Sequence, residues 1–189
     1  MNEPEHNSTL LGRHALLRPR LCCRDLSCLD FACLAERGIF YYCLDLDNTL
    51  APRADNHPLP HIAAAFNAAR RQGYVRDACI VSNIIFGNKR RQRVAQFAQD
   101  LEIEHFFAAN FFERKPCANP FRFALQAMGA QAEQTAMVGD QLFTDIVGGN
   151  ALGLYTILVE PLGPDHWSTR LTGRRRREEQ TLRALGLRD

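Results

Sequence analysis

Short apolar segments alternate regularly with helical ones along most of this chain. Five segments are rich in β-branched, aromatic and other apolar residues, and stretches with apolar residues at helical spacing separate them. The strand-like segments are 40–45, 74–81, 105–109, 135–138 and 155–159, and the helical ones are 61–72, 89–101, 119–129 and 145–152. Such alternation predicts an α/β fold: a three-layer sandwich around a mainly parallel sheet of about five strands.

Length and composition limit the classes of protein to consider. The 189 residues suffice for one domain with its own core, and 46% hydrophobic with 23% charged residues is ordinary globular composition. The formal net charge of +2 is too small to indicate nucleic-acid binding by itself. No apolar run approaches the roughly 18 to 20 residues that span a bilayer, and the polar start lacks the pattern of a secretory signal. We therefore expect an intracellular, cytoplasmic protein.

The chain divides into three parts by composition. We expect a flexible tail over 1–13, a single folded domain over 14–165 and a basic C-terminal helical tail over 166–189. Near the start, a helix-like piece over 26–36 follows several arginines, and it could cover one edge of the sheet or rest on a membrane. The seven cysteines are odd in number and lack CxxC spacing, which favours small buried thiols over a metal or disulfide cluster.

Polar side chains gather where the predicted strands end. In parallel α/β sheets the reactive groups meet at the carboxyl ends of the strands. The residues at these positions are Asp45 and Asp47, Ser82 and Asn83, and Asp140, and Lys115 lies in the loop after the third predicted strand. We expect these residues to form one site.

Three carboxylates, a hydroxyl and a lysine fit phosphoryl transfer. Neighbouring acids are tolerable where a cation lies between them, and hard oxygen ligands suit Mg²⁺. A lysine and a hydroxyl can hold a phosphoryl group, and an aspartate can act as a covalent nucleophile. Taken one at a time, these residues could equally be a strand-end turn, a helix cap and a solvated lysine.

Four segments resemble, in order, the motifs of haloacid-dehalogenase-type (HAD) phosphatases. They are Asp45-Leu46-Asp47-Asn48-Thr49, Ser82-Asn83, Lys115-Pro116 and Gly139-Asp140-Gln141-Leu142-Phe143-Thr144-Asp145. The resemblance covers about residues 38–160. It implies a Rossmann-like, HAD-type fold and a Mg²⁺-dependent phosphomonoesterase that forms an aspartyl-phosphate.

The resemblance also implies a role for each matching residue. Asp45 would be the nucleophile, Asp47 the general acid and base, and Lys115 would hold the phosphoryl group. Ser82, Asn83 and Thr49 would contact the substrate. Mg²⁺ would be bound by Asp45, the backbone carbonyl of Asp47 and Asp140, with Asp145 in support.

The details of the fourth motif and the upstream arginines resemble the YqeG-type branch, HAD subfamily IIIA. This branch is related to mitochondrial phosphatidylglycerophosphate phosphatase, so the resemblance implies hydrolysis of phosphatidylglycerophosphate to phosphatidylglycerol, a step of phospholipid biosynthesis. Ile84 departs from the branch, which often has a second asparagine after Ser-Asn. This departure would change contacts to the substrate and leave the core chemistry as it is.

Two further observations bear on the substrate. The stretch between Asp45 and Ser82 is too short for a cap domain, and an open site suits lipid head groups, proteins or nucleic acids. The tail carries Arg174 to Arg177 and several leucines, which could lie on anionic lipid at the inner face of the membrane or pack on the domain. No stacking aromatics interleave these arginines, so nucleic acid is disfavoured.

Three interpretations remain open from the sequence. The first is a phosphatase acting on a lipid head group. The second is a phosphatase for a soluble sugar phosphate or nucleotide, and the third is a non-catalytic module of the same fold that docks on RNA or a protein. Four costly charged groups in register argue against the third. The oligomeric state cannot be inferred from the sequence.

Overall fold

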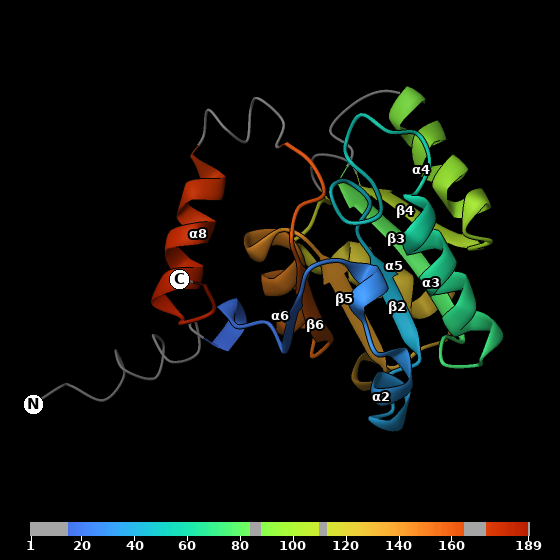
Figure 1. Ribbon diagram of the computed structural model, residues 1–189, viewed down its shortest axis with the longest axis horizontal. Coiled ribbons are helices and arrows are strands. Elements are labelled where there is room, and N and C mark those ends of the chain that lie inside the picture. Colours follow the sequence, from blue (N-terminus) through green and yellow to red (C-terminus); the bar gives the residue numbers. More distant parts are fainter. Residues whose placement is uncertain (1–14, 84–87, 110–112, 165–172, 189) are drawn as a thin grey trace, which may run out of the picture.

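A computed structural model describes residues 15–83, 88–109, 113–164 and 173–188. Its centre is a six-stranded sheet in the order β1-β6-β5-β2-β3-β4, in which every neighbouring pair of strands is parallel. The strands are β1 (Leu21–Cys23), β2 (Tyr41–Leu44), β3 (Asp77–Asn83), β4 (His105–Ala109), β5 (Thr135–Gly139) and β6 (Tyr155–Val159). The predicted α/β fold with a parallel sheet is confirmed (Figure 1).

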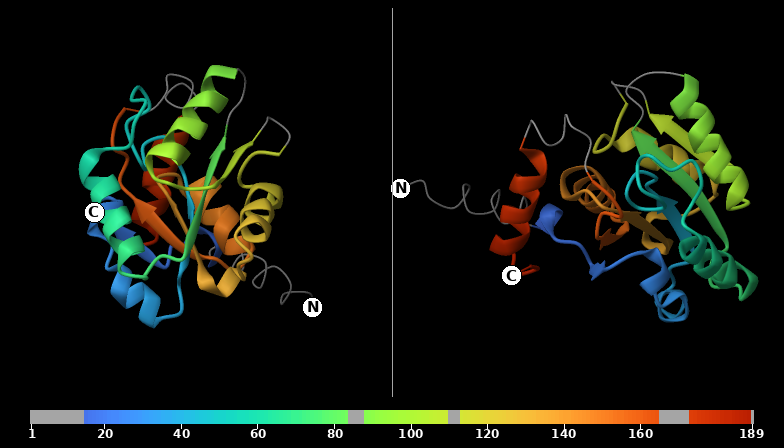
Figure 2. Two further views of the ribbon diagram at one scale, coloured as in Figure 1. Left: turned by 90° about the vertical axis from the view of Figure 1, so that its right-hand side faces the viewer. Right: turned by 45° about the horizontal axis from the view of Figure 1, so that its top comes forward.

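Helices cover both faces of the sheet, which makes three layers. They are α2 (Phe31–Glu36), α3 (Pro60–Arg71), α4 (Asn88–Asp100), α5 (Ala118–Ala127), α6 (Val147–Ala151) and α8 (Arg174–Ala184). Along β2, Tyr42 and Leu44 join the core beneath α2, α3 and α4, whereas Cys43 joins the core beneath α5. This alternation follows from the period of two in a strand, and Figure 2 shows α3 and α5 on opposite sides of the sheet.

The helix α3 illustrates how sequence specifies these layers. Pro60 occupies its first turn, where a missing N–H costs nothing. Ile62, Phe66 and Ala69 follow at helical spacing and are buried against the sheet. Burying a side chain such as Phe66 stabilises the fold by about 1.5–3 kcal/mol.

The sheet has six strands where about five were predicted, because β1 was missed. This edge strand has three residues, of which Cys22 is exposed, and it pairs only with β6 through Leu21 to Cys23. So short a segment cannot show the period-two pattern that identifies a strand in sequence.

The helix predicted over 26–36 is divided in two. Asp25 caps a 3₁₀ turn, η1 (Leu26–Cys28), by accepting from the Ser27 N–H, and Asp30 caps α2 by accepting from the Cys33 N–H. Two successive caps therefore start two short helices in place of one. The predicted tail over 1–13 lies outside the described residues.

The helix α8 begins with the arginine block and stands at the β6 side of the molecule (Figure 1). Its Leu182 is buried with Leu142, Ile146 and Leu158 in a small core of its own. Leu142 and Ile146 bound η3 (Leu142–Ile146), a wide helical turn that follows β5 and continues into α6. Within the described part of the chain, no helix is long and apolar enough to cross a membrane.

Candidate active site

The polar residues singled out from the sequence meet at the carboxyl edge of the sheet. The central strand β2 pairs with β5 and β3, and its last residue Leu44 lies opposite Val138 and Ile80. Asp45 follows directly after β2, and Asp140 follows directly after β5. Ser82 and Asn83 form the end of β3. The shared register of the strands therefore places these side chains side by side.

Lys115 supplies the positive charge at the centre of the site. Its ammonium lies 2.6 Å from Asp45 Oδ1 and 2.8 Å from Asp145 Oδ1, and its side chain is only 1% exposed. Burial alone would lower the pKa of the Lys115 ammonium, but the charges of Asp145 and Asp45 outweigh burial and raise that pKa above its ordinary value. Lys115 is therefore held as a buried cation between two carboxylates.

Asn83 holds the backbone on which Lys115 stands. Its side-chain Oδ1 accepts from the Lys115 N–H at 2.8 Å, and its Nδ2 donates to the Lys115 carbonyl at 3.2 Å. Because both polar atoms of this amide bind the backbone of Lys115, Asn83 links the end of β3 to the segment that precedes α5. The amide thus fixes where the lysine side chain enters the site.

Three buried aspartates surround one small volume. Oxygens of Asp45, Asp140 and Asp145 lie within 4.8 Å of one another. Burial raises the pKa of Asp45 to about 7 against the opposing charge of Lys115, with Asp145 and Asp47 adding to the rise. Burial and the charge of Asp45 likewise raise the pKa of Asp140 well above its ordinary range, although Arg175 opposes this. A divalent cation would relieve this repulsion.

The position of Asp145 depends on Gly139. Asp145 Oδ2 accepts from the Gln141 N–H at 3.0 Å, and its own N–H donates to the Gln141 carbonyl at 2.9 Å. A Cβ atom at residue 139 would collide with the Asp145 carboxylate. Glycine at the end of β5 therefore creates the space in which Asp145 reaches Lys115.

Asp140 is held from outside the sheet by the C-terminal helix. Arg175 of α8 donates to Asp140 Oδ2 at 2.6 Å and to the Asp140 carbonyl at 2.9 Å. Glu178 lies 3.3 Å from the same guanidinium and accepts from the Phe143 N–H, and burial is the main cause that raises its pKa. Asp140 Oδ1 is buried and has no hydrogen-bond partner among the described residues.

Asp47 lies at the open side of the site. Its Oδ1 is 2.6 Å from Arg93 and its Oδ2 is 2.8 Å from Arg53, and its side chain is 19% exposed. It is not one of the three aspartates whose oxygens cluster. The next residue, Asn48, has a positive φ of 63° and turns the chain away from β2. The two arginines therefore point Asp47 toward α4 and the loop after β2.

The two hydroxyl residues are both buried. Ser82 is 5% exposed and, with Asp47 and Asn83, lines a cavity at the open side of the site. Thr49 is fully buried, and its Oγ1 has no hydrogen-bond partner in the described part of the chain. Ile84, which departs from the branch pattern, lies outside the described residues.

Four further residues that contact the site were not identified from the sequence: Arg53, Arg93, Arg175 and Glu178. Arginines on surface helices and loops are usually solvated, so their types alone carry no signal. For α8, the spacing of Arg175 and Glu178 by three residues indicates a helical pair, but it does not reveal that this pair contacts Asp140.

The donor set fits a hard divalent cation. Mg²⁺ takes oxygen ligands, commonly one or two carboxylates together with waters and phosphate oxygens. Asp45 and Asp140 offer such carboxylates, and the unpartnered Oδ1 of Asp140 is a buried acceptor with no donor among the described residues. An unpaired buried carboxylate oxygen is costly, and coordination by a cation would remove that cost.

Comparison with known proteins agrees with this arrangement. The family described as mitochondrial PGP phosphatase matches residues 4–162. The Bacillus subtilis protein named probable phosphatase YqeG is 33% identical over 153 residues, which are 80% of this chain and 81% of that protein. The Arabidopsis thaliana phosphatidylglycerophosphate phosphatase 1, named as chloroplastic/mitochondrial, is 28% identical over 82% of this chain but 44% of its own length.

A solved structure shows the same fold. It is that of an uncharacterized protein from Listeria monocytogenes, with a TM-score of 0.52 and 18% identity over 64% of this chain and 78% of that one. The YqeG-type resemblance seen in the motifs is confirmed by the sequence relatives. The chain belongs to the mitochondrial PGP phosphatase family and is a YqeG-type phosphatase of the haloacid-dehalogenase superfamily.

Proposed function

We propose that the protein is a Mg²⁺-dependent phosphomonoesterase that converts phosphatidylglycerophosphate to phosphatidylglycerol through an aspartyl-phosphate. The observation that carries the chemistry is the buried ammonium of Lys115, which lies 2.6 Å from Asp45 and 2.8 Å from Asp145 at the carboxyl edge of the sheet. A cation fixed there can hold the negative oxygens of a phosphoryl group beside the Asp45 carboxylate. The names of the family and of the plant relative support the substrate.

The reaction proceeds in two steps. In the first, an oxygen of Asp45 forms a bond to phosphorus, the bond from phosphorus to the leaving alcohol breaks, and Asp47 gives that alcohol oxygen a proton. In the second, water attacks the phosphorus and gives its proton to Asp47, and the bond to Asp45 breaks to release inorganic phosphate. Lys115 and Ser82 hold the phosphoryl oxygens in both steps.

Asp47 must change partners before it can transfer a proton. Its two oxygens now contact Arg93 and Arg53 at 2.6 and 2.8 Å, so both are engaged by guanidinium groups and neither is free to reach a leaving oxygen. Proton transfer therefore requires that at least one of these contacts is exchanged when substrate binds. The contacts of Arg93 and Arg53 therefore control when Asp47 can transfer a proton.

The metal site would use Asp45, Asp140 and the backbone carbonyl of Asp47, with Asp145 in support. When bound, Mg²⁺ neutralises charge on the phosphoryl oxygens and polarises the phosphorus. Arg175 holds the outer oxygen of Asp140, and Lys115 holds one oxygen of Asp45. The protein's own contacts thus orient both carboxylates toward the shared volume.

An open site favours a substrate that brings its own surface. Between Asp45 and Lys115 the described residues form only α3, β3, α4 and β4 of the main domain. With no cap contributed by these elements, a small metabolite would remain exposed to water. A head group at the surface of an anionic membrane fits such a site, so we place the active protein in the cytoplasm in peripheral contact with the inner face of the membrane.

The test is phosphate release from phosphatidylglycerophosphate in mixed micelles with Mg²⁺, beside glycerol 3-phosphate. We expect release that is selective for the lipid, is lost with a chelator and falls by at least ~10³-fold in Asp45→Asn, because the nucleophile is absent. With a substrate labelled in its phosphoryl group, the unaltered protein should carry acid-stable label at residue 45, and Asp45→Asn should carry none.

Two outcomes would change the proposal. Equal turnover of glycerol 3-phosphate would retain the chemistry and replace the lipid by a soluble phosphate. Mg²⁺-dependent release that persists in Asp45→Asn would remove Asp45 as the nucleophile.

A further inference from the structure

A cavity rich in positive charge adjoins the open side of the site. It has a volume of about 210 Å³, and its lining includes Asp47, Ser82, Arg53, Lys89, Arg90 and Arg93. We call it the cationic pocket. Its lining residues include four cationic side chains and the single carboxylate of Asp47, which Arg53 and Arg93 contact. Neither the buried aspartates nor Lys115 belongs to this lining.

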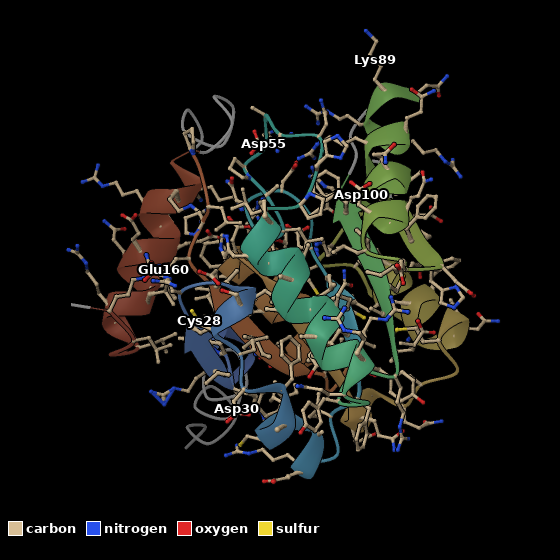
Figure 3. The ribbon with its side chains drawn as sticks, turned by 45° about the vertical axis from the view of Figure 1, so that its right-hand side comes forward. Cys28, Asp30, Asp55, Lys89, Asp100 and Glu160 are labelled. Atoms are coloured by element: carbon tan, nitrogen blue, oxygen red, sulfur yellow. The ribbon has the colours of Figure 1, made fainter. Side chains whose placement is uncertain are left out.

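Arg93 lines the cationic pocket, and three hydrogen bonds hold its side chain in place. Its Nε donates to the Asp55 carbonyl at 2.7 Å and one terminal nitrogen donates to the Pro52 carbonyl at 3.3 Å, while the other binds Asp47 at 2.6 Å. Arg93 therefore ties α4 to the loop after β2. Figure 3 shows Asp55 in that loop and Lys89 on the first turn of α4 at the same end of the molecule.

The charges at the start of α4 oppose the helix itself. Lys89 and Arg90 lie in its first turn, which contains no acidic residue. The N-terminal end of a helix is partly positive, so each basic side chain there costs about 0.3–1 kcal/mol at low salt. A local arrangement that costs stability is expected where function requires it, and an anion bound in the pocket would offset the cost.

Arg53 is a partly exposed member of the pocket that contacts Asp47. Its side chain is 29% exposed and contacts Asp47 at 2.8 Å from the loop after β2. An anion entering the pocket would compete with Asp47 for this guanidinium. Binding there would thus also supply the exchange of partners that Asp47 needs before it can transfer a proton.

We propose that the cationic pocket binds a second anionic group of the substrate, carried by the alcohol that leaves. This inference rests on the proposed function, because Asp47 is there the residue that protonates the leaving oxygen. The pocket includes Asp47 and Ser82, so it lies where that alcohol extends from the site. The shared chemistry is a phosphate or phosphodiester, whether it belongs to a lipid head group or to a soluble bisphosphorylated molecule.

Three substrates separate the sources of the anion. Glycerol 3-phosphate has no second anion, glycerophosphoglycerol phosphate carries a soluble phosphodiester, and phosphatidylglycerophosphate in micelles carries the same phosphodiester in a lipid. The variant is Lys89→Ala/Arg90→Ala, and the matched control is Arg91→Ala, an exposed neighbour on α4 outside the pocket lining.

We expect the double variant to lower kcat/KM for both diester substrates about tenfold relative to glycerol 3-phosphate. In Arg91→Ala this ratio should stay as in the unaltered protein. A loss confined to micelles would assign the two cations to the membrane surface and overturn the proposal. An unchanged ratio, or an equal loss on all three substrates, would overturn it as well.

A binding measurement separates this inference from the proposed function. Glycerophosphoglycerol has the phosphodiester but no phosphomonoester, so its affinity for the Asp45→Asn protein can be measured by calorimetry without turnover. We expect Kd to rise about tenfold when Lys89→Ala/Arg90→Ala is added, and to fall in low salt. If Asp45→Asn binds glycerophosphoglycerol but the unaltered protein has no phosphatase activity, only the proposed function is refuted. If Asp45→Asn does not bind it while the unaltered protein turns over substrate normally, the proposal for the pocket is refuted.

Discussion

Asp45 and Asp47 are separated by a single residue, yet their surroundings differ in almost every respect. Asp45 is 8% exposed at the side chain and belongs to a closed cluster with Lys115, Asp140 and Asp145. Asp47 is 19% exposed and belongs to an open edge with Arg53 and Arg93. Asp45 and Asp140 of the closed cluster directly follow neighbouring strands, whereas the open edge is formed by a loop and α4. Two aspartates that are separated by one residue therefore lie in different electrostatic surroundings.

The two regions should respond differently to the loss of a charge. In the closed cluster, little water reaches the charges, so each ion depends on its partners. At the open edge, solvent screens the charges, and an ion pair contributes little to stability. Loss of a charge should therefore destabilise the closed cluster more than the open edge.

Lys115→Met should destabilise the metal-free protein by about 3–5 kcal/mol, because it leaves the buried carboxylates of Asp45 and Asp145 without their cation. Arg53→Met should cost less than about 1 kcal/mol, because its ion pair is partly solvated. Urea unfolding in the presence of a chelator measures both. Similar losses for the two variants would show that the closed cluster and the open edge do not differ as described.

Arg175→Ala should weaken Mg²⁺ binding by about 10- to 100-fold, the range found when a residue that orients a metal ligand is removed. The reason is that Arg175 holds Asp140 Oδ2 and leaves Oδ1 free to face the other carboxylates. Calorimetric titration of Mg²⁺ measures the effect, with the exposed neighbour Arg176→Ala as the control. Tighter binding in Arg175→Ala would instead mean that the guanidinium competes with the metal.

The apparent affinity for Mg²⁺ should be about tenfold lower at pH 6 than at pH 8. Folding raises the pKa of Asp45 to about 7, mainly through burial, so the folded protein keeps this proton to higher pH than the unfolded chain. The metal-free protein consequently loses stability as pH rises from about 4 to about 7. Above that window the ionised carboxylate is available to a metal.

Thermal unfolding with and without Mg²⁺ at the two pH values measures this effect. The Mg²⁺-induced rise in Tm should be larger at pH 8 than at pH 6, and Asp45→Asn should reduce the difference between these two rises. Equal rises at both pH values would show that Asp45 does not titrate in this range.

The closed cluster could be predicted from sequence, and the open edge could not. Asp45 and Asp140 follow strands that the apolar pattern identifies, and parallel strands bring their carboxyl ends together. Lys115 lies in the loop after the third predicted strand, and the motif resemblance added Asp145, which the structure places in contact with Lys115. The chemical roles of these residues remain proposals, but the proximity of Asp45 and Asp140 follows from the order of the strands.

The arginine contacts depend on information that local patterns do not contain. Arg53 and Arg93 reach Asp47 because the loop after β2 packs beside α4, and nothing in either segment specifies that meeting. The alternative that the C-terminal leucines pack on the domain agrees with buried Leu182, yet the contact of Arg175 with Asp140 was not foreseen. The edge strand β1 was missed for a related reason, since three residues carry no period.

The contact between Arg175 and Asp140 shows that the site extends beyond the part of the chain that matches the family. The match to the family ends at Leu162. The guanidinium that binds Asp140 belongs to Arg175 of α8, which lies beyond that limit. A shortened version cut at the end of the matched region would keep every motif and still expose a carboxylate that has lost its support. Boundaries for expression, and searches for functionally equivalent relatives, should therefore extend through Leu182.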